Sequence, residues 1–506
     1  MLLPLTGDSL TLDQLADIAH GDAQVSLAPE AARRVDAART VVDEKATGDA
    51  AVYGVNTGFG ALAETAIPRD QLGALQLNLL RSHAAGVGDP LPVAAVRASM
   101  ALRANVLAKG FSGIRRSTLD LLIDMLNRRV HPIVPCRGSV GASGDLAPLA
   151  HLALVLVGEG AATVNGSEVM TGADALAMAG LAPTVLESKE GLALINGTQP
   201  STAVAALAAV TGGNLARAAD VAAALSIDAL RGSMHPFEAR IHASRPHAGQ
   251  RTAAANIFAL LQGSAINKSH EDCRRVQDAY SLRCAAQVHG AARDAIGFAT
   301  RTIEIEANSA TDNPMVFADS GEIVSGGNFH GAPVAIAADL LALAVVQFAT
   351  ISERRADRLV NPALSDLPPF LTTASGLQSG YMIAQVTAAA LASELKTLAH
   401  PASVDTIPTS GNKEDHVSMS MGAALKAARA VEHAAHVLAV ELLCACQGID
   451  LLAPLSTSAP LQRAHAFVRS IAPMLTDDRP PSPDIVRIAA AIIDGAFVRA
   501  CGAEVK

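Results

Sequence analysis

The sequence has no tryptophan and only three tyrosines among 506 residues, and aromatic residues make up 3% of it. Charged residues are also scarce, at 17%, and 48 acidic residues outnumber 39 basic ones, for a net charge of -9. Surfaces that bind nucleic acid need a basic stripe, often interleaved with aromatic side chains. Because the sequence has no such stripe, we expect no nucleic-acid partner.

Cysteine is equally sparse, with six residues that show no paired metal-ligand spacing. Such a pattern is typical of reduced thiols in a cytosolic protein, and it predicts no metal site. Cys444 and Cys446 form only a Cys-x-Cys pair, which more often belongs to a packed core. The six are Cys136, Cys273, Cys284, Cys444, Cys446 and Cys501.

Neither an export signal nor a membrane span is expected. The N-terminus carries Asp8 and Asp13, where a secretory signal needs a basic start and an unbroken apolar run. The most apolar stretch, Pro333 to Thr350, contains Asp339, which favours a buried bundle helix over a membrane span. The sequence therefore predicts a cytoplasmic protein.

Alanine and leucine are abundant, in long stretches without the period-2 alternation of strands, which predicts a mainly α fold. Half of the residues are hydrophobic, more than a monomer of this length easily buries, so we expect subunit interfaces. We divide the chain near residue 200, into an N-terminal region, 1–200, and an elongated helical bundle, 201–506, that forms the oligomer core. The Ala/Leu-rich stretches lie at about 201–230, 333–360, 380–399 and 416–446.

Local signals place several elements more closely. Thr11 and Gln14 form a capping box for a helix that stops at the glycine after His20. Pro29 suits the first position of the next helix. Two short hairpins are expected exceptions to the helical pattern, turning at Asn165-Gly166 and near Asp319-Ser320-Gly321.

The most informative segment is Gly138-Ser-Val-Gly-Ala-Ser-Gly-Asp-Leu-Ala-Pro-Leu-Ala-His151. Small residues flank Ser143, and Gly144 lets its amide nitrogen approach the carbonyl of Ala142, so a backbone cyclisation is sterically possible. Asp145 is expected to cap a helix that begins directly after it, whose positive end favours negative charge developing nearby. Alone, a Gly-rich loop before a helix is more often a plain turn or an anion site.

This segment resembles the signature of the histidine and phenylalanine ammonia-lyase family, and the likeness continues in order along most of the chain. The resemblance implies an aspartase-like helical bundle that forms a homotetramer, with active sites that mix residues from different subunits. The other matching motifs are Tyr53-Gly-Val-Asn-Thr-Gly-Phe-Gly60, Arg81-Ser-His-Ala-Ala-Gly86, Asn196-Gly-Thr-Gln199, Val276-Gln-Asp-Ala-Tyr-Ser-Leu-Arg283, Thr311-Asp-Asn-Pro314, Ser325-Gly-Gly-Asn-Phe-His330 and Gly411-Asn-Lys-Glu-Asp-His-Val-Ser-Met419.

In that family an Ala-Ser-Gly tripeptide cyclises and loses water to form 4-methylidene-imidazol-5-one. The resemblance implies that Ala142, Ser143 and Gly144 form this group, with the methylidene carbon of Ser143 as the electrophile and no external cofactor. Ser82-His83 resembles the histidine-type selectivity pair, where phenylalanine-specific members have Phe-Leu and many tyrosine-specific ones have His-His. The implied reaction converts L-histidine to trans-urocanate and ammonia.

Such an elimination needs a base and a way to expel a poor leaving group. Tyr53 and Tyr280 fall in family motifs, and we assign the base to Tyr280 and assistance at the amine to Tyr53. Gln277, Tyr280 and Arg283 are spaced three apart, so if helical they face one pocket. The alternative for each tyrosine is a packed side chain with a satisfied hydroxyl.

The remaining site residues follow from the same resemblance. Arg283 offers a planar fork for the substrate carboxylate, with Asn196 as a second contact. His83 and Glu414 are expected to hold the imidazole, and Glu414 can also share a proton. A surface ion pair for Arg283 and a solvated loop for Glu414 are the alternatives. Phe329 and Met382 complete the predicted substrate pocket.

Several departures and rival functions stay open. Lys413 stands where histidine-type members typically have glutamine, Gly411 replaces an alanine, and Leu395 replaces an asparagine. The nearest rivals are a tyrosine or phenylalanine ammonia-lyase and a 2,3-aminomutase of the same family. A fumarase-type lyase should carry a Gly-Ser-Ser-x-Met-Pro loop and a dehydrogenase a Gly-x-Gly-x-x-Gly motif, and the sequence contains neither. A non-enzymatic scaffold would have no use for an intact Ala-Ser-Gly.

Overall fold

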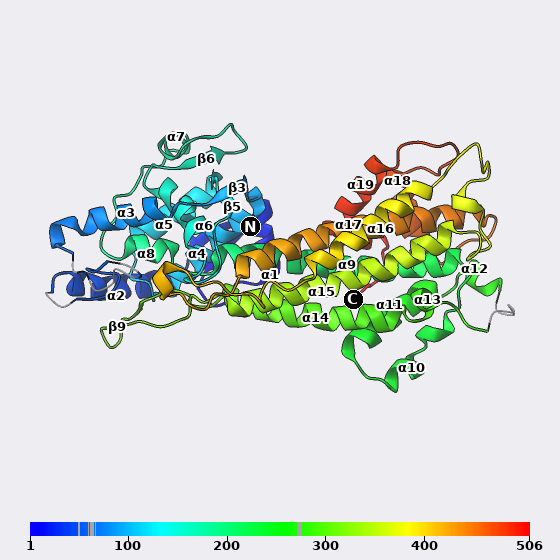
Figure 1. Ribbon diagram of the computed structural model, residues 1–506, viewed down its shortest axis with the longest axis horizontal. Coiled ribbons are helices and arrows are strands. Elements are labelled where there is room, and N and C mark those ends of the chain that lie inside the picture. Colours follow the sequence, from blue (N-terminus) through cyan, green and yellow to red (C-terminus); the bar gives the residue numbers. More distant parts are fainter. Residues whose placement is uncertain (49–50, 59, 61–64, 66, 271–275) are drawn as a thin grey trace. The chain divides into compact units, whose positions relative to one another are not determined.

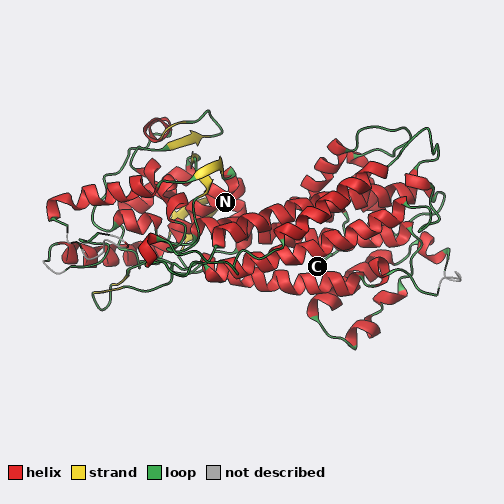
Figure 2. Cartoon of the chain, viewed as in Figure 1, coloured by secondary structure: helices red, strands yellow, loops and turns green. Residues whose placement is uncertain are grey.

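The computed structural model describes residues 1–506 except 49–50, 59, 61–64, 66 and 271–275, so Phe59 and Cys273 lie outside the described residues. Helices dominate the chain and the strands are short (Figures 1 and 2). The prediction of a mainly α bundle with a few hairpins is confirmed.

The chain forms two compact units, each assembled from three separate segments. The first unit comprises Met1–Leu207, Thr300–Ala338 and Ala402–Leu425, and the second comprises Ala208–Ala299, Asp339–Pro401 and Lys426–Lys506. The division of the chain at residue 200 into folding regions stays a prediction.

Short helices and strands make up most of the first unit. They are β1 (Leu2–Leu5), α1 (Leu12–His20), β2 (Gln24–Leu27), α2 (Pro29–Ala46), η2 (Arg69–Gln71), α3 (Leu72–His83), β3 (Val87–Pro90), α4 (Val93–Ala108), α5 (Arg116–Asn127), β4 (Val130–Pro132), β5 (Pro135–Arg137), α6 (Leu146–Leu156), β6 (Ala161–Val164), β7 (Met170–Thr171), α7 (Gly172–Met178), α8 (Glu190–Ile195), β8 (Met315–Phe317), β9 (Glu322–Val324) and η5 (Ser410–Asn412).

Four long helices contribute residues to both units, and within the described residues the other elements of the second unit are all helices. The long helices are α9 (Gln199–Ala229), α14 (Ala285–Ala307), α15 (Ala332–Val360) and α17 (Ser420–Leu451). The second unit adds η3 (His235–Phe237), α10 (Ala239–Ala243), α11 (Ala248–Leu261), α12 (Ala265–Lys268), α13 (Tyr280–Arg283), η4 (Pro369–Leu371), α16 (Met382–Leu398), α18 (Ala459–Ile471), α19 (Ser482–Ile493) and α20 (Ala496–Ala500).

The local sequence signals are confirmed where they were strongest. Thr11 and Gln14 make a reciprocal capping box on α1, and Gly21 ends that helix in the left-handed conformation. Pro29 is the first residue of α2. Each of the Ala/Leu-rich stretches overlaps one helix of the bundle, namely α9, α15, α16 or α17.

Both expected hairpins form, from β6 with β7 and from β8 with β9. The structure adds pairings that the sequence analysis missed: β1 runs parallel to β2, β3 pairs with β5, and β4 joins the β6–β7 hairpin. These strands have two to four residues each, too few for an alternating pattern to stand out.

The bundle helices α15 and α17 have the length and apolar composition of membrane spans. The most apolar 18-residue stretch of each is nevertheless largely buried within the chain, 72% of it in α15 and 83% in α17. Both therefore serve as core helices. Within the second unit, Arg355 of α15 forms a fully buried ion pair with Glu441 of α17 at 2.5 Å. Ser226 of α9 donates to the same carboxylate at 2.6 Å, so the Glu441 carboxylate links three core helices.

Candidate functional site

The Ala142-Ser143-Gly144 tripeptide occupies the loop that leads into α6. Gly144 adopts a φ of +69°, which favours glycine, and a side chain there would overlap the backbone of Gly197. The amide of Asp145 donates to the carbonyl of Gly197 at 2.8 Å. The downstream end of the tripeptide is thus packed directly on the Asn196-Gly197 backbone.

Two other segments of the first unit hold the upstream end of the tripeptide. The carbonyl of Gly141 accepts a hydrogen bond from the Ser418 hydroxyl at 2.9 Å and from the amide of Gly331 at 3.3 Å. The amide of Met419 donates to Val140 at 2.7 Å. These contacts bring three of the sequence motifs together around the loop.

Asp145 directly precedes α6 as expected, but its side chain does not cap that helix. The fully buried carboxylate instead accepts a hydrogen bond from the Ser139 hydroxyl at 2.6 Å and one from the amide of Ser201, in the first turn of α9, at 2.8 Å. Burial raises the pKa of this carboxyl, and the Ser139 and Ser201 bonds partly offset the rise. The prediction that Asp145 caps α6 was therefore wrong, because the fold places the first turn of α9 within hydrogen-bond distance of the Asp145 carboxylate.

Asn196 approaches the tripeptide most directly. Its side-chain Nδ2 donates to the carbonyl oxygen of Ser143 at 3.1 Å. Its Oδ1 is buried and has no hydrogen-bond partner in the described structure. An unpaired buried oxygen is costly unless a ligand or reacting group satisfies it, so Asn196 points to a functional contact at Ser143.

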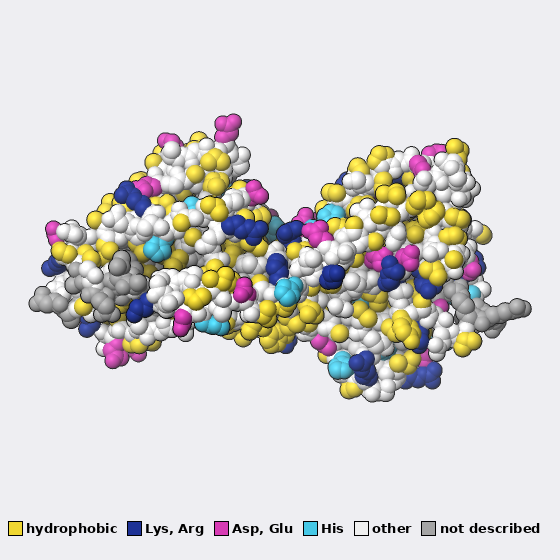
Figure 3. All heavy atoms as spheres, viewed as in Figure 1, with side chains coloured by type: hydrophobic (Ala, Val, Ile, Leu, Met, Phe, Trp, Pro, Cys, Tyr) yellow, Lys and Arg dark blue, Asp and Glu magenta, His cyan; other side chains and the backbone are white. Residues whose placement is uncertain are grey.

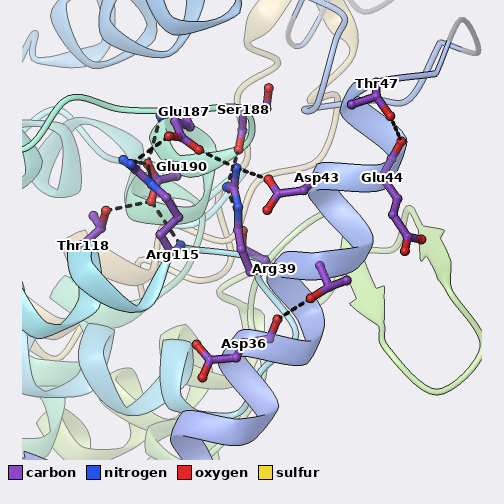
Figure 4. A network of polar contacts seen from close by, with 12 residues as sticks. Asp36, Arg39, Asp43, Glu44, Thr47, Arg115, Thr118, Glu187, Ser188 and Glu190 are labelled. Carbon is purple, nitrogen blue, oxygen red and sulfur yellow. Dashed lines mark hydrogen bonds and ion pairs between the residues drawn. The ribbon is translucent and has the colours of Figure 1, made fainter.

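Asn196 follows α8, a short helix that is fixed at its N-terminal end. The buried Gln76 side chain of α3 accepts from the amide of Gly191 at 2.9 Å. The buried carboxylate of Glu190 accepts from the Thr118 hydroxyl at 2.7 Å and from Nε of Arg115 at 2.9 Å (Figure 4). The Gln76 bond satisfies an amide that the helix terminus leaves free, and together these bonds hold the helix that presents Asn196.

Tyr53, His83 and Glu414 lie near one another in the same unit. Burial raises the pKa of Tyr53, and the Glu414 carboxylate adds to that rise. Burial lowers the pKa of His83, partly offset by its bond to Leu79 and by Glu414. Glu414 accepts a hydrogen bond from the Thr409 hydroxyl at 2.6 Å. A protonated phenol, a neutral imidazole and a carboxylate therefore share this region.

The contacts of His83 favour one tautomer. Nδ1 lies 2.9 Å from the carbonyl oxygen of Leu79, one turn earlier in α3, and 3.0 Å from the Ser82 hydroxyl. Because a carbonyl oxygen only accepts, we assign the proton to Nδ1, which then donates to Leu79. Nε2 therefore presents a lone pair, which can accept a hydrogen bond from a substrate N–H.

Gln277, Tyr280, Arg283 and Met382 lie in the second unit. The condition that the first three are all helical is not met at Gln277, because α13 begins only at Tyr280, after an extended Ala279. All three still line one cavity of about 480 Å3. The Arg283 guanidinium lies 4.7 Å from the centre of the Tyr280 ring, and Tyr280 is 70% exposed.

Phe329 and Met382, the two remaining predicted pocket residues, belong to different units. Phe329 is half-buried, two residues before the amide of Gly331 that bonds to Gly141. Met382 is the first residue of α16 and is also half-buried. Lys413, the departure beside Glu414, is exposed.

The structure also gives roles to residues that the sequence analysis left unassigned. Gly197 and Gln76 position Asn196, and the only sequence signal for Gly197 was its place in the Asn196-Gly-Thr-Gln199 motif. Within the described residues, no group of three or more His, Cys, Asp or Glu side chains is arranged to hold a metal ion. The five described cysteines are free thiols, and Cys444 and Cys446 are buried in the core.

Comparisons with known proteins agree with one another. Residues 10–470 match the family model described as aromatic amino acid lyase. The chain is 56% identical to a histidine ammonia-lyase of Anaeromyxobacter sp. (strain K), over 98% of this chain and 99% of that protein. Among solved structures, it resembles a Trypanosoma cruzi histidine ammonia-lyase with 45% identity and a TM-score of 0.93, covering 99% and 95% of the two chains. It also resembles a tyrosine aminomutase of Streptomyces globisporus with 37% identity and a TM-score of 0.94, covering 99% and 98%.

Proposed function

The chain belongs to the aromatic amino acid lyase family, and from that premise we propose that it eliminates ammonia from L-histidine to give trans-urocanate. The choice of L-histidine as substrate rests on the hydrogen bonding of His83. Its Nδ1 proton is engaged by Leu79, so that Nε2 can accept the N–H of a substrate imidazole, while the nearby Glu414 offers a charged acceptor. A phenylalanine ring has no donor for either acceptor, and a tyrosine ring has a single O–H in place of the imidazole N–H groups.

We propose that Ala142, Ser143 and Gly144 form 4-methylidene-imidazol-5-one, without an external cofactor. The surroundings fit this group: Gly144 has no side chain to obstruct ring closure, Asn196 donates to Ser143, and Asn196 Oδ1 has no partner. Once formed, the group supplies an electrophile at the former Ser143 side chain. Asn196 can stabilise negative charge that develops on the Ser143 oxygen, as hydrogen-bond donors do in oxyanion holes.

The reaction breaks one Cβ–H bond and the Cα–N bond and forms a carbon–carbon double bond. We assign removal of the β-proton to Tyr280 and proton donation toward the departing amine to Tyr53, whose raised pKa keeps its phenol protonated. Glu414 can share that proton. Arg283 binds the carboxylate through its planar fork, with the second N–H of Asn196 and with Gln277. Phe329 and Met382 line the remaining substrate pocket.

We further propose that the enzyme is a cytoplasmic homotetramer whose sites combine residues of several subunits. Tyr280 is 70% exposed, although a catalytic base works in a site shielded from water. Hydrophobic side chains are exposed on both units (Figure 3). In this proposal region 1–200 carries the prosthetic group and region 201–506 forms the oligomer core. Exposed apolar side chains on its long helices include Phe298, Ile305, Ile336, Leu343, Ile383 and Val386.

A substrate panel tests the proposed activity. Purified protein is incubated with L-histidine, L-tyrosine and L-phenylalanine, and products are separated so that β-amino acids are seen beside the unsaturated acids. We expect urocanate from histidine, and His83→Leu should lower kcat/KM for histidine by about ten- to a hundredfold because the imidazole loses a partner. Conversion of tyrosine to a β-amino acid, with histidine inert, would instead favour the aminomutase activity named for the similar Streptomyces protein.

A further inference from the structure

Arg103, in the middle of α4, has no role in the mechanism above, yet its side chain is fully buried. One guanidinium nitrogen donates to the carbonyl of Asn196 at 2.8 Å and to the side-chain oxygen of Gln199 at 2.7 Å. The other donates to the carbonyl of Ala193. Among the described residues, each of these acceptors is a neutral oxygen and none is a carboxylate.

A buried guanidinium without a hydrogen-bonded counter-ion is expensive, so the position of this cation calls for an explanation. Burial lowers the pKa of Arg103 to about 10, and the charge of the buried Asp312 carboxylate partly offsets this, so Arg103 stays charged at neutral pH. Its bonds to Ala193 and Asn196 satisfy carbonyls at the C-terminal end of α8, opposite the end held by Gln76 and Glu190. Both ends of the helix that presents Asn196 are therefore fixed by buried side chains.

Gly197 connects this cation to the tripeptide. On one side, Gly197 packs so closely on Gly144 that a side chain on Gly144 would overlap it. On the other, a side chain on Gly197 would lie 2.6 Å from the Arg103 guanidinium. One layer of backbone thus separates Arg103 from the residues that would form the electrophile.

We propose that Arg103 is a positioning residue for this reaction: by holding the Asn196-Gly197 backbone, it aligns the Asn196 amide with the Ser143 oxygen. This inference rests on the proposed function. Lysine cannot replace the planar fork, because its single ammonium cannot reach the Ala193, Asn196 and Gln199 oxygens in the same geometry. Arg103→Lys therefore keeps the charge and loses the alignment.

Arg97 provides a matched control on the same helix. It is also buried and also donates to backbone carbonyls, those of Ile18 at 3.0 Å and Leu126 at 3.1 Å. Within the described residues, its hydrogen bonds go to Ile18, Leu126 and His131, and none goes to Asn196 or Gly197. If any buried arginine of α4 mattered equally, Arg97→Lys would cause the same defect as Arg103→Lys.

The test uses the full-length wild type, Arg103→Lys and Arg97→Lys. Circular dichroism checks folding, and the mass of the peptide containing Ser143 reports loss of water on ring formation. The rate at which added cyanide ion bleaches the near-ultraviolet absorbance then measures electrophile reactivity without substrate. We expect Arg103→Lys to slow bleaching and lower kcat by about tenfold or more with little change in KM, whereas Arg97→Lys resembles the wild type. Incomplete ring formation in an Arg103→Lys variant that folds would also support the role of Arg103, because ring closure depends on the same backbone contacts.

The role of Arg103 would be overturned if Arg103→Lys bleached at the wild-type rate and kept the wild-type kcat. It would also be overturned if Arg97→Lys lost as much bleaching rate and kcat as Arg103→Lys. A wild-type peptide that keeps its full mass would sink the proposed function, and this inference with it. Should Arg103→Lys fail to fold, Gln199→Met provides the second variant, since it removes one of the three oxygens that Arg103 contacts. It should show the same slower bleaching to a smaller degree, and wild-type bleaching there would count against the proposal.

Discussion

The side-chain amide of Asn196 donates a hydrogen bond to the carbonyl oxygen of Ser143 across 3.1 Å, while the other end of the same amide, Oδ1, is buried without a partner. The contact joins two motifs 53 positions apart in the sequence. It places a donor at the oxygen where negative charge would develop during elimination, which is where a donor stabilises a transition state.

Asn196→Ala should lower kcat by about a hundred- to a thousandfold, the usual effect of removing one donor from a developing oxyanion. Steady-state kinetics with L-histidine give the value. Asn196→Asp has nearly the same shape but offers no N–H at neutral pH, so it should lose as much. Near-normal turnover in Asn196→Asp would mean that Asn196 only fills space.

Gly144→Ala should prevent ring formation, because the added carbon would overlap the backbone of Gly197. The mass of the Ser143 peptide provides the measurement. Gly321 is the matched control, since its φ of +67° is close to the +69° of Gly144 while its surroundings are open. Gly321→Ala should form the ring normally. If both variants failed alike, left-handed strain rather than contact with Gly197 would be the cause.

Tyr280→Phe and Tyr53→Phe should both reduce kcat, but their isotope effects should differ. Loss of the base makes cleavage of the Cβ–H bond slower, so Tyr280→Phe should lower kcat by about a hundredfold or more and enlarge the effect of β-deuterated histidine. Tyr53→Phe should slow departure of the amine without enlarging that effect. The opposite pattern would exchange the two roles.

Tyr381, the third tyrosine, serves as the control for both variants. It is buried at 2% exposure, and burial raises its pKa to about 12. Tyr381→Phe should leave the isotope effect unchanged whatever it does to stability.

The stability of the protein should fall as the pH drops from about 6.5 to about 4. Burial, followed by the charges of Arg97 and Arg129, lowers the pKa of His131 to about 4 in the folded chain. Because the unfolded chain binds the proton first, stability is fully present above the ordinary pKa of about 6.5 and is lost progressively below it, by at most about 1.4 kcal/mol per pH unit.

His131→Gln can still accept the hydrogen bond that His131 takes from Arg97 at 3.1 Å. It should therefore show a smaller drop in Tm than the wild type between pH 7 and pH 4, measured by circular dichroism. An equal drop in both proteins would assign the acid sensitivity to other groups.

Much of this picture could be predicted from local sequence patterns. The capping box of Thr11 and Gln14 and the turn at Asn165-Gly166 depend on residues a few positions apart, and both form. Contacts between distant segments were not predictable in this way. The Asp145 carboxylate bonds to Ser201, 56 positions away, in preference to the helix that follows it.

The same limit applies to the candidate site. The family motifs identify Asn196 and His83, but the tautomer of His83 depends on the hydrogen bond of its ring to Leu79. Arg103 carries no sequence signal at all, because one arginine in an Ala/Leu-rich helix resembles any other until the fold places it under Asn196. The β1–β2 pair was missed because four-residue strands show too little periodicity.

The most direct test of the account compares wild-type protein and Ser143→Ala in the presence of L-histidine, followed by the near-ultraviolet absorbance of trans-urocanate. We predict steady urocanate formation by the wild type without added cofactor, and its loss in Ser143→Ala while the circular dichroism spectrum is unchanged. Urocanate formation by Ser143→Ala at the wild-type rate would contradict the assignment of the electrophile to this tripeptide. No urocanate from a folded wild type would contradict the proposed reaction itself.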